Sequence, residues 1–113
     1  MENEIKFSMK VWNTLNMTKG CIATEVKPIK DENRKWIAIY PLDEGDNRGR
    51  YKYFEIELSR KIIDNDLDWF DQDEIKEEIF IHSLSELNTL LETKNLNPLS
   101  FDVPWKFNYP YHY

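Results

Sequence analysis

The chain has few of the residues that a disulfide-bonded, zinc-binding or membrane-spanning protein needs. Only one of its 113 residues is a cysteine, Cys21, and only two are histidines. A single cysteine forms no intramolecular disulfide, and no cysteine and histidine cluster has zinc-ligand spacing. The longest apolar run, WIAIYPL at residues 36–42, is much too short to cross a bilayer. The first ten residues, MENEIKFSMK, contain no apolar signal segment, so we expect a cytoplasmic protein without membrane association.

The sequence also lacks an excess of basic residues. It has 21 acidic and 15 basic side chains and a net charge of −6. Nucleic-acid-binding proteins usually present a basic face, so nucleic acid is not an expected partner. Residues 64–78, DNDLDWFDQDEIKEE, hold eight acids and one lysine, a charge of −7, so the rest of the chain sums to +1. One segment therefore accounts for the acidity, and a field concentrated in this way can steer a basic partner.

What is present is enough apolar surface for one domain over residues 1–113. Hydrophobic residues make up 41% of the chain and aromatic residues 14%, which predicts a single folded core. Alternating or short continuous apolar patterns predict strands at residues 4–12, 21–26, 35–42, 51–58 and 78–83. The segment at 13–20 reads as a turn, and DEGDNRGR at 43–50 reads as a loop. Strands joined by connections of this length favour an antiparallel sheet.

One helix is predicted over residues 84–95. Ser83 and Glu86 form an S-x-x-E capping box at its start, in which each side chain accepts a hydrogen bond from a backbone N–H. The leucines that follow recur at helical spacing and form one apolar face (Leu84, Leu87, Leu90 and Leu91). Asn95 and Pro98 end the pattern.

The C-terminal tail is rich in aromatic residues at every second position (Trp105, Phe107, Tyr109, Tyr111 and Tyr113). An extended chain would place all five rings on one side. We expect a strap that packs on the domain, and an exposed docking strip is the alternative. The predicted fold class is α+β: a mainly antiparallel sheet of about four or five strands, one amphipathic helix packed on it, and an extended C-terminal strap.

The acidic segment admits several interpretations. Asp64, Asp66 and Asp68 match the first ligands of a calcium-binding EF-hand loop, but Trp69 replaces the required glycine and Ile75 the bidentate glutamate. We therefore expect no metal. An ordinary solvated surface anchored by Trp69 and Phe70 is one interpretation. The other is a partner-binding surface whose aromatic anchor lies among carboxylates, made by Asp66, Asp68, Trp69, Asp71, Asp73 and Glu74.

Little in the sequence points to catalysis, and we expect neither an enzyme nor a cofactor. Cys21 with His82 or His112 is a conceivable nucleophile and base. Cys21, however, lies in an apolar strand pattern typical of an inert buried thiol. A small carboxylate-dependent hydrolase using residues 64–78 remains the alternative from another class. A phage or plasmid inhibitor of a nucleic-acid enzyme, acting by charge mimicry, is a third.

The stretches W…EEIFIHS.SEL..LL and NP..FD.PW, over about residues 64–110, resemble immunity proteins of bacterial polymorphic toxin systems, including those of contact-dependent growth inhibition. The resemblance implies a non-enzymatic inhibitor that binds one cognate toxin C-terminal domain in the cytoplasm, often a nuclease. It does not imply an oligomeric state. A carboxylate-rich surface that fills the basic cleft of a nuclease is consistent with this implication.

Overall fold

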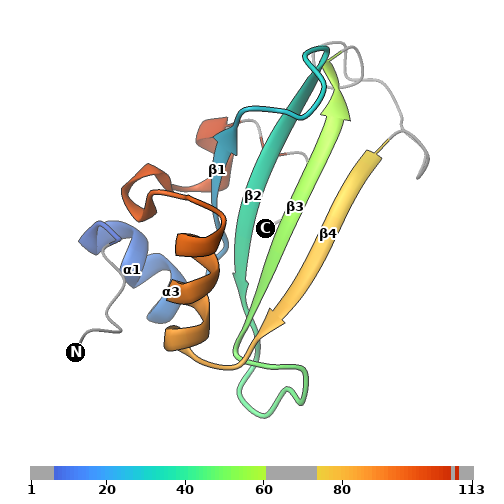
Figure 1. The fold of residues 1–113 in the computed structure, drawn as a ribbon. Helices are drawn as coiled ribbons and strands as arrows, with labels where there is room; N and C mark the ends of the chain where they lie inside the picture. The colour runs from blue at the N-terminus through green and yellow to red at the C-terminus, as the bar shows by residue number, and fades with distance from the viewer. Residues whose placement is uncertain (1–6, 61–73, 108, 110–113) are drawn as a thin grey trace.

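A computed structural model describes residues 7–60, 74–107 and 109 of the chain (Figure 1). The described part is an α+β domain, as predicted, in which two helices pack on an antiparallel sheet. In chain order the elements are α1 (Met9–Asn16), β1 (Ile22–Val26), β2 (Asn33–Pro41), β3 (Tyr51–Ser59), β4 (Glu74–Ile81), α3 (Leu84–Thr93) and the 3-10 turns η2 (Pro98–Ser100) and η3 (Pro104–Phe107).

The sheet has the spatial order β1-β2-β3-β4, so each strand lies beside its neighbour in the sequence. All three pairings are antiparallel. Ile22 lies opposite Ile39, Trp36 opposite Ile56, and Tyr51 opposite Ile81. β1 and β4 are therefore the two edges of the described sheet, and β4 extends the predicted strand at 78–83 back into the acidic segment.

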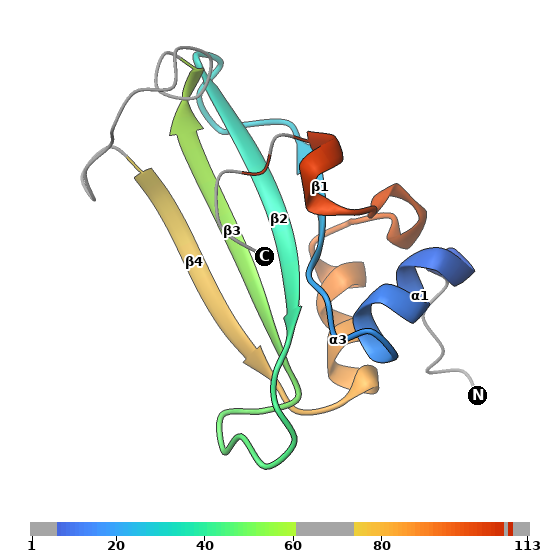
Figure 2. The same ribbon diagram turned by 180° about the vertical axis from the view of Figure 1, so that it is seen from behind.

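One face of the sheet is covered by α1 and α3, which lie side by side in both views (Figures 1 and 2). Leu87 and Leu91 are 0% and 1% exposed, which confirms the predicted apolar stripe of α3. They join a core that includes Ile22, Ile37, Ile39, Tyr51, Tyr53, Ile81, Val11, Leu15 and Phe101. This core covers only one end of the sheet face, because α3 ends at Thr93.

The capping box at the start of α3 is present. The Ser83 Oγ accepts a hydrogen bond from the Glu86 N–H at 3.1 Å. The Glu86 carboxylate accepts one from the His82 N–H at 2.9 Å, one residue earlier than the usual arrangement. The first bond satisfies an N–H group that the first turn of a helix leaves without a partner, and the second fixes the residue that precedes the cap.

The predicted strand at residues 4–12 is wrong over the described residues 7–12, and the turn predicted at 13–20 begins only after α1 ends at Asn16. Ser8 begins a helix instead, because its Oγ accepts the Val11 N–H at 3.2 Å. Val11 and Leu15 are both buried and lie four residues apart, on one face of α1. Met9, which a strand would place on the same face as Phe7 and Val11, is 79% exposed. Phe7 and Val11 fit both the spacing of a strand face and that of a helix face. Only Leu15, one helical turn after Val11, distinguishes the helix from the strand.

The other face of the sheet is covered in part by the C-terminal segment (Figure 2). Tyr109 is 6% exposed and packs with a second group of buried side chains. The Phe107 carbonyl accepts a hydrogen bond from the Trp36 indole N–H at 2.7 Å, and the Tyr40 and Tyr109 hydroxyls lie 2.5 Å apart. The second group comprises Cys21, Ala23, Trp36, Ala38, Phe54, Ile56, Leu58 and Tyr109. As far as Tyr109, the tail forms the expected strap.

The alternation of rings along the tail does not hold in the strap. η3 turns the chain at Pro104–Phe107, so Trp105 is 62% exposed while Tyr109 is buried. A 3-10 turn repeats every three residues, which removes the every-second-residue pattern. Tyr111 and Tyr113 lie outside the described residues.

Candidate functional site

Most of the predicted partner-binding residues lie outside the described part of the chain. This holds for Asp66, Asp68, Trp69, Asp71 and Asp73, and for the inward turn expected of Phe70. Glu74 is the first residue of β4, opposite Leu58. The acidic surface as a whole therefore stays a prediction, and the geometry below concerns its described end and the side chains around it.

The described end of the acidic segment is the edge strand β4. Glu77 and Glu78 are successive residues of a strand, so their side chains lie on opposite faces of the sheet. Both side chains are 48% exposed, and each has a lysine nearby. Glu77 lies 3.2 Å from the Lys94 ammonium, and Glu78 lies 3.6 Å from that of Lys52. The edge thus presents carboxylates on both faces.

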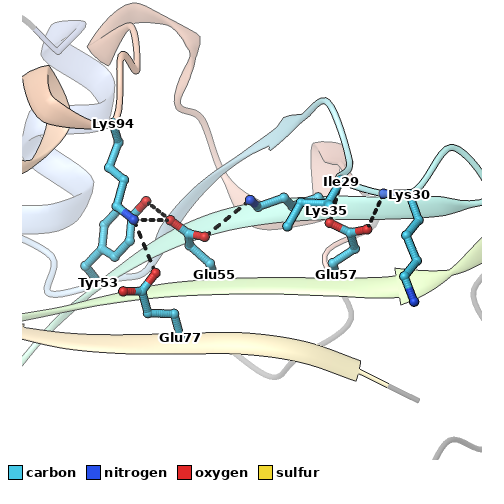
Figure 3. A network of polar contacts seen from close by, with 8 residues as sticks. All are labelled: Ile29, Lys30, Lys35, Tyr53, Glu55, Glu57, Glu77 and Lys94. Carbon is cyan, nitrogen blue, oxygen red and sulfur yellow. Dashed lines mark hydrogen bonds and ion pairs between the residues drawn. The ribbon is translucent and has the colours of Figure 1, made fainter. Parts of the chain in front are cut away.

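A row of polar side chains continues from Glu77 across the part of the sheet that α3 leaves uncovered (Figure 3). The centre of the row is Glu55 on β3, which accepts a 2.6 Å hydrogen bond from the Tyr53 hydroxyl. Lys35 from β2 lies 3.3 Å from this carboxylate, and Lys94 lies 3.2 Å from it. Lys94 follows the last residue of α3, so it joins α3 to β3 and β4 at once.

Glu57 has a different role from Glu55, although both lie on the same face of β3. It is 1% exposed, and its carboxylate accepts the Ile29 N–H at 2.8 Å and the Lys30 N–H at 2.9 Å. The Asn33 side-chain amide donates a third bond at 2.9 Å. Glu57 therefore holds the connection between β1 and β2 onto the sheet, as a buried carboxylate whose two oxygens both accept hydrogen bonds.

These contacts keep Glu55 and Glu57 ionised at neutral pH. Burial raises the pKa of Glu57, but hydrogen bonds from Ile29, Lys30 and Asn33 outweigh that effect and leave the pKa below its ordinary value. Burial likewise raises the pKa of Glu55, and the Tyr53 hydroxyl with the two lysines lowers it further than burial raises it. Burial and the Glu55 carboxylate raise the pKa of Tyr53, so its hydroxyl stays protonated and donates.

A hollow of about 360 Å³ lies beside this row. Its lining residues are Ile29, Lys35, Glu55, Glu57, Lys76 and Glu77. The lining side chains combine fixed carboxylates with lysines and one apolar residue. Ile29 is 68% exposed at its rim. Glu55 and Glu57 in this lining are already hydrogen-bonded and ionised, so neither is poised to act as a general acid.

The second hollow, of about 600 Å³, lies at the opposite end of the sheet beside the loop between β2 and β3. It is lined by Lys19, Leu42, Asp43, Glu44, Gly45, Asp46, Gly49, Arg50 and His82. Gly49 is required there, since its φ is +149° and an added Cβ would lie 2.7 Å from the Ile81 carbonyl oxygen. The lining mixes three acids with Lys19, Arg50 and His82, and this mixture marks no single ligand chemistry.

Cys21 is buried in the apolar group beneath the strap, as its sequence context predicted. Burial raises the pKa of its thiol to about 12, against a smaller lowering by the Tyr40 hydroxyl. A thiol in this environment is protonated and a poor nucleophile at neutral pH. His82 is exposed at the start of α3, and His112 lies outside the described residues.

Two further observations concern only the part of the chain that the structure describes. It contains no group of three or more His, Cys, Asp or Glu side chains placed to hold a metal ion. None of its helices combines the length and the apolar composition that a bilayer crossing demands.

Sequence reasoning missed the Tyr53, Glu55 and Lys94 contacts. One signal for them was present: YKYFEIEL places Glu55 and Glu57 on one face of a strand whose other face carries Phe54, Ile56 and Leu58. Acids within such a strand need partners from neighbouring elements. Nothing in the sequence identified Lys94 as one of those partners.

No family model, no curated protein and no solved structure matches the chain.

Proposed function

We propose that the protein is a non-enzymatic immunity protein that neutralises a cognate bacterial toxin domain in the cytoplasm by stoichiometric binding. The partner is a basic protein, and a nuclease is the toxin class whose phosphate-binding cleft best matches an acidic inhibitor. The resemblance of residues 64–110 to immunity proteins supports the biological setting. The chemistry of the surface supports the mode of action.

The observation that carries the proposal is the segregation of charge. Residues 64–78 hold a charge of −7, whereas all other residues together hold +1. The described end of this segment is an edge strand, where Glu77 and Glu78 expose carboxylates on both sheet faces. Concentrated charge of one sign at an accessible edge raises the association rate with an oppositely charged protein.

The geometry of the buried acids favours binding over catalysis. A carboxylate general acid needs a raised pKa, while the pKa of Glu55 and that of Glu57 are both lowered. The Cys21 thiol, with a pKa of about 12, is not an activated nucleophile. These side chains stabilise the sheet and its connections, so we assign no reaction to them.

Affinity capture from the source bacterium, with mass spectrometry of the bound protein, tests the proposal. A basic toxin domain encoded beside this protein is the expected result. Capture of a basic nucleic-acid enzyme of the host would instead favour an inhibitor acting by charge mimicry. Turnover of a generic ester or phosphate substrate by the purified protein would contradict the non-enzymatic assignment.

Binding kinetics at two salt concentrations then test the acidic segment itself. Reversing Asp66 and Asp71 to lysine should slow association at low salt by about tenfold or more and flatten the salt dependence. Reversing Asp31 and Glu32, which are exposed and lie outside the segment, changes the net charge equally and is the matched control. Equal association rates of the two double variants would show that the segment is not the binding surface.

A further inference from the structure

The two edges of the sheet differ in what covers them. At the β1 edge, Ala23 and Asp102 exchange two backbone hydrogen bonds of 2.9 Å each. Asp102 belongs to the segment that leads from η2 to η3, and its carboxylate also lies 3.0 Å from Lys106. The C-terminal segment therefore occupies the outward backbone groups of Ala23 and hinders the addition of another strand at this edge.

At the other edge, one backbone hydrogen bond shows in which direction the backbone groups of β4 point. The Ile81 carbonyl accepts the Arg50 N–H at 2.7 Å, so the backbone of Ile81 faces β3. Backbone groups of successive residues in a strand point to opposite sides. Glu78 and Phe80 therefore direct their N–H and C=O groups away from the sheet. No described segment of the chain lies beside them there.

β4 lacks the backbone features, such as a proline or a bulge, that often prevent edge pairing. Residues 74–81 contain no proline, and the register with β3 runs without interruption from Ile81 to Glu74. Short length, bulges, prolines and charges are the common means of protecting an edge. Here the protection is charge, because Glu77 and Glu78 lie in the strand and six further acids precede or begin it in residues 64–74.

We propose that the outward edge of β4, centred on Glu78 and Phe80, is a docking edge for an extended basic segment of a partner protein, which adds to the sheet as a fifth strand. Acidic side chains oppose pairing with the same strand of a second copy, since like charges directly opposite are destabilising. They favour a strand with lysine or arginine. This inference rests on the proposed function for the identity of the partner.

The side chains at the edge suggest where the basic residue of that strand lies. Lys52 is 3.6 Å from the Glu78 carboxylate, a loose and partly exposed pair that a second cation can join. The Arg48 guanidinium already lies over the Phe80 ring, 5.0 Å from its centroid. A basic side chain of the added strand is therefore expected opposite Glu78, and an uncharged one opposite Phe80.

Nuclear magnetic resonance of the full-length ¹⁵N-labelled protein tests the docking edge with a short synthetic threonine peptide that carries lysine at every fourth position, so that a lysine opposite Glu78 leaves a threonine opposite Phe80. At low salt the peptide should shift the amide resonances of Glu78 and Phe80 and slow their hydrogen exchange severalfold. The same peptide with glutamate in place of lysine should do neither. Slow exchange of both amides in the free protein would overturn the proposal, because the edge would then already be paired.

Two variants at one position separate the backbone from the charge. Glu78→Pro removes the outward N–H, and proline is tolerated where an edge residue makes no ladder hydrogen bond. Glu78→Ala removes only the carboxylate. The alanine variant should bind the lysine peptide more weakly, and the proline variant should not bind it. Equal binding by the two folded variants would overturn the proposal, and if the proline variant does not fold, the exchange measurement on the unmodified protein still decides.

The same variants distinguish this inference from the proposed function. A captured basic partner that binds the proline and alanine variants equally well would refute the docking edge and leave the inhibitor proposal intact. Binding of the lysine peptide at Glu78 and Phe80, in a protein that captures no basic partner, would support the edge and refute the inhibitor. If the protein formed a dimer in which the Glu78 and Phe80 amides were protected from hydrogen exchange, the added strand would come from a second copy of this chain. That result would overturn the proposal.

Discussion

Replacing Glu57 by glutamine should destabilise the protein more than the loss of a surface charge does. The Glu57 carboxylate is buried and accepts hydrogen bonds from the Ile29 and Lys30 N–H groups and the Asn33 amide, at 2.8 to 2.9 Å. A glutamine side chain offers one oxygen, so its own NH₂ must face at least one of these donors. Each buried donor left without an acceptor costs about 1–3 kcal/mol, so we expect a loss of about 2–4 kcal/mol.

Urea denaturation at pH 7 measures this loss. With an m-value of about 2 kcal/mol/M, the midpoint of the Glu57→Gln variant should fall by about 1–2 M. Glu78→Gln on β4 is the matched control. Its side chain is 48% exposed, so the change should cost less than about 1 kcal/mol. A Glu57→Gln midpoint equal to that of the unmodified protein would refute the argument that three donors depend on this carboxylate.

The effect of Glu57 should also depend on pH. Its pKa in the folded protein lies below the ordinary value of 4.5, because the three hydrogen bonds outweigh the effect of burial. A depressed pKa contributes stability that is fully present above the ordinary pKa and is lost as the pH falls through the folded one. The difference in unfolding free energy between the unmodified protein and the glutamine variant should therefore shrink below about pH 4.5. A difference that grows with acidity would contradict the sign of the shift.

Further changes test the core, the helix cap and the strap. Leu91→Ala should cost about 2–5 kcal/mol in denaturant melts, because the side chain is 1% exposed; a neutral change would mean that α3 does not pack through this stripe. Ser83→Ala should cost about 1 kcal/mol through loss of the cap. Cys21→Ala should leave partner binding unchanged, and a folded variant that fails to bind would restore a role for the thiol. Tyr109→Ala should uncover Cys21 and speed its modification by a thiol reagent at pH 8, whereas an unchanged rate would show that the strap does not protect it.

Local signals were sufficient for the elements whose patterns have only one interpretation. The serine cap, the leucine spacing and the following Asn95 and Pro98 predicted α3 to within two residues of its observed end. The continuous apolar run at 35–42 predicted β2, and alternation at 51–58 predicted β3. In these segments the apolar pattern, the turn residues and the final packing all favour the same structure.

Local signals failed where one pattern fits two structures. Phe7 and Val11 occur in both the strand spacing and the helix spacing at the N-terminal end of the chain. The packing of Phe7 against Phe101, with ring centroids 5.8 Å apart, depends on a residue far away in the sequence. Glu74, Glu77 and Glu78 are poor strand formers, yet they form β4 because the pairing with β3 overrides their local preference.

By itself the sequence determined the charge of the protein and where that charge lies, because formal charge depends only on residue identity. It also determined that Cys21 is buried among apolar side chains and that one capped helix follows the last strand. Only the tertiary structure brought Glu55, Glu77 and Lys94 together, since they come from β3, β4 and the end of α3. It alone decided that the C-terminal segment covers the β1 edge and that the outward groups of Glu78 and Phe80 face away from the sheet. Strand order and register are long-range properties, and no local stretch of sequence carries them.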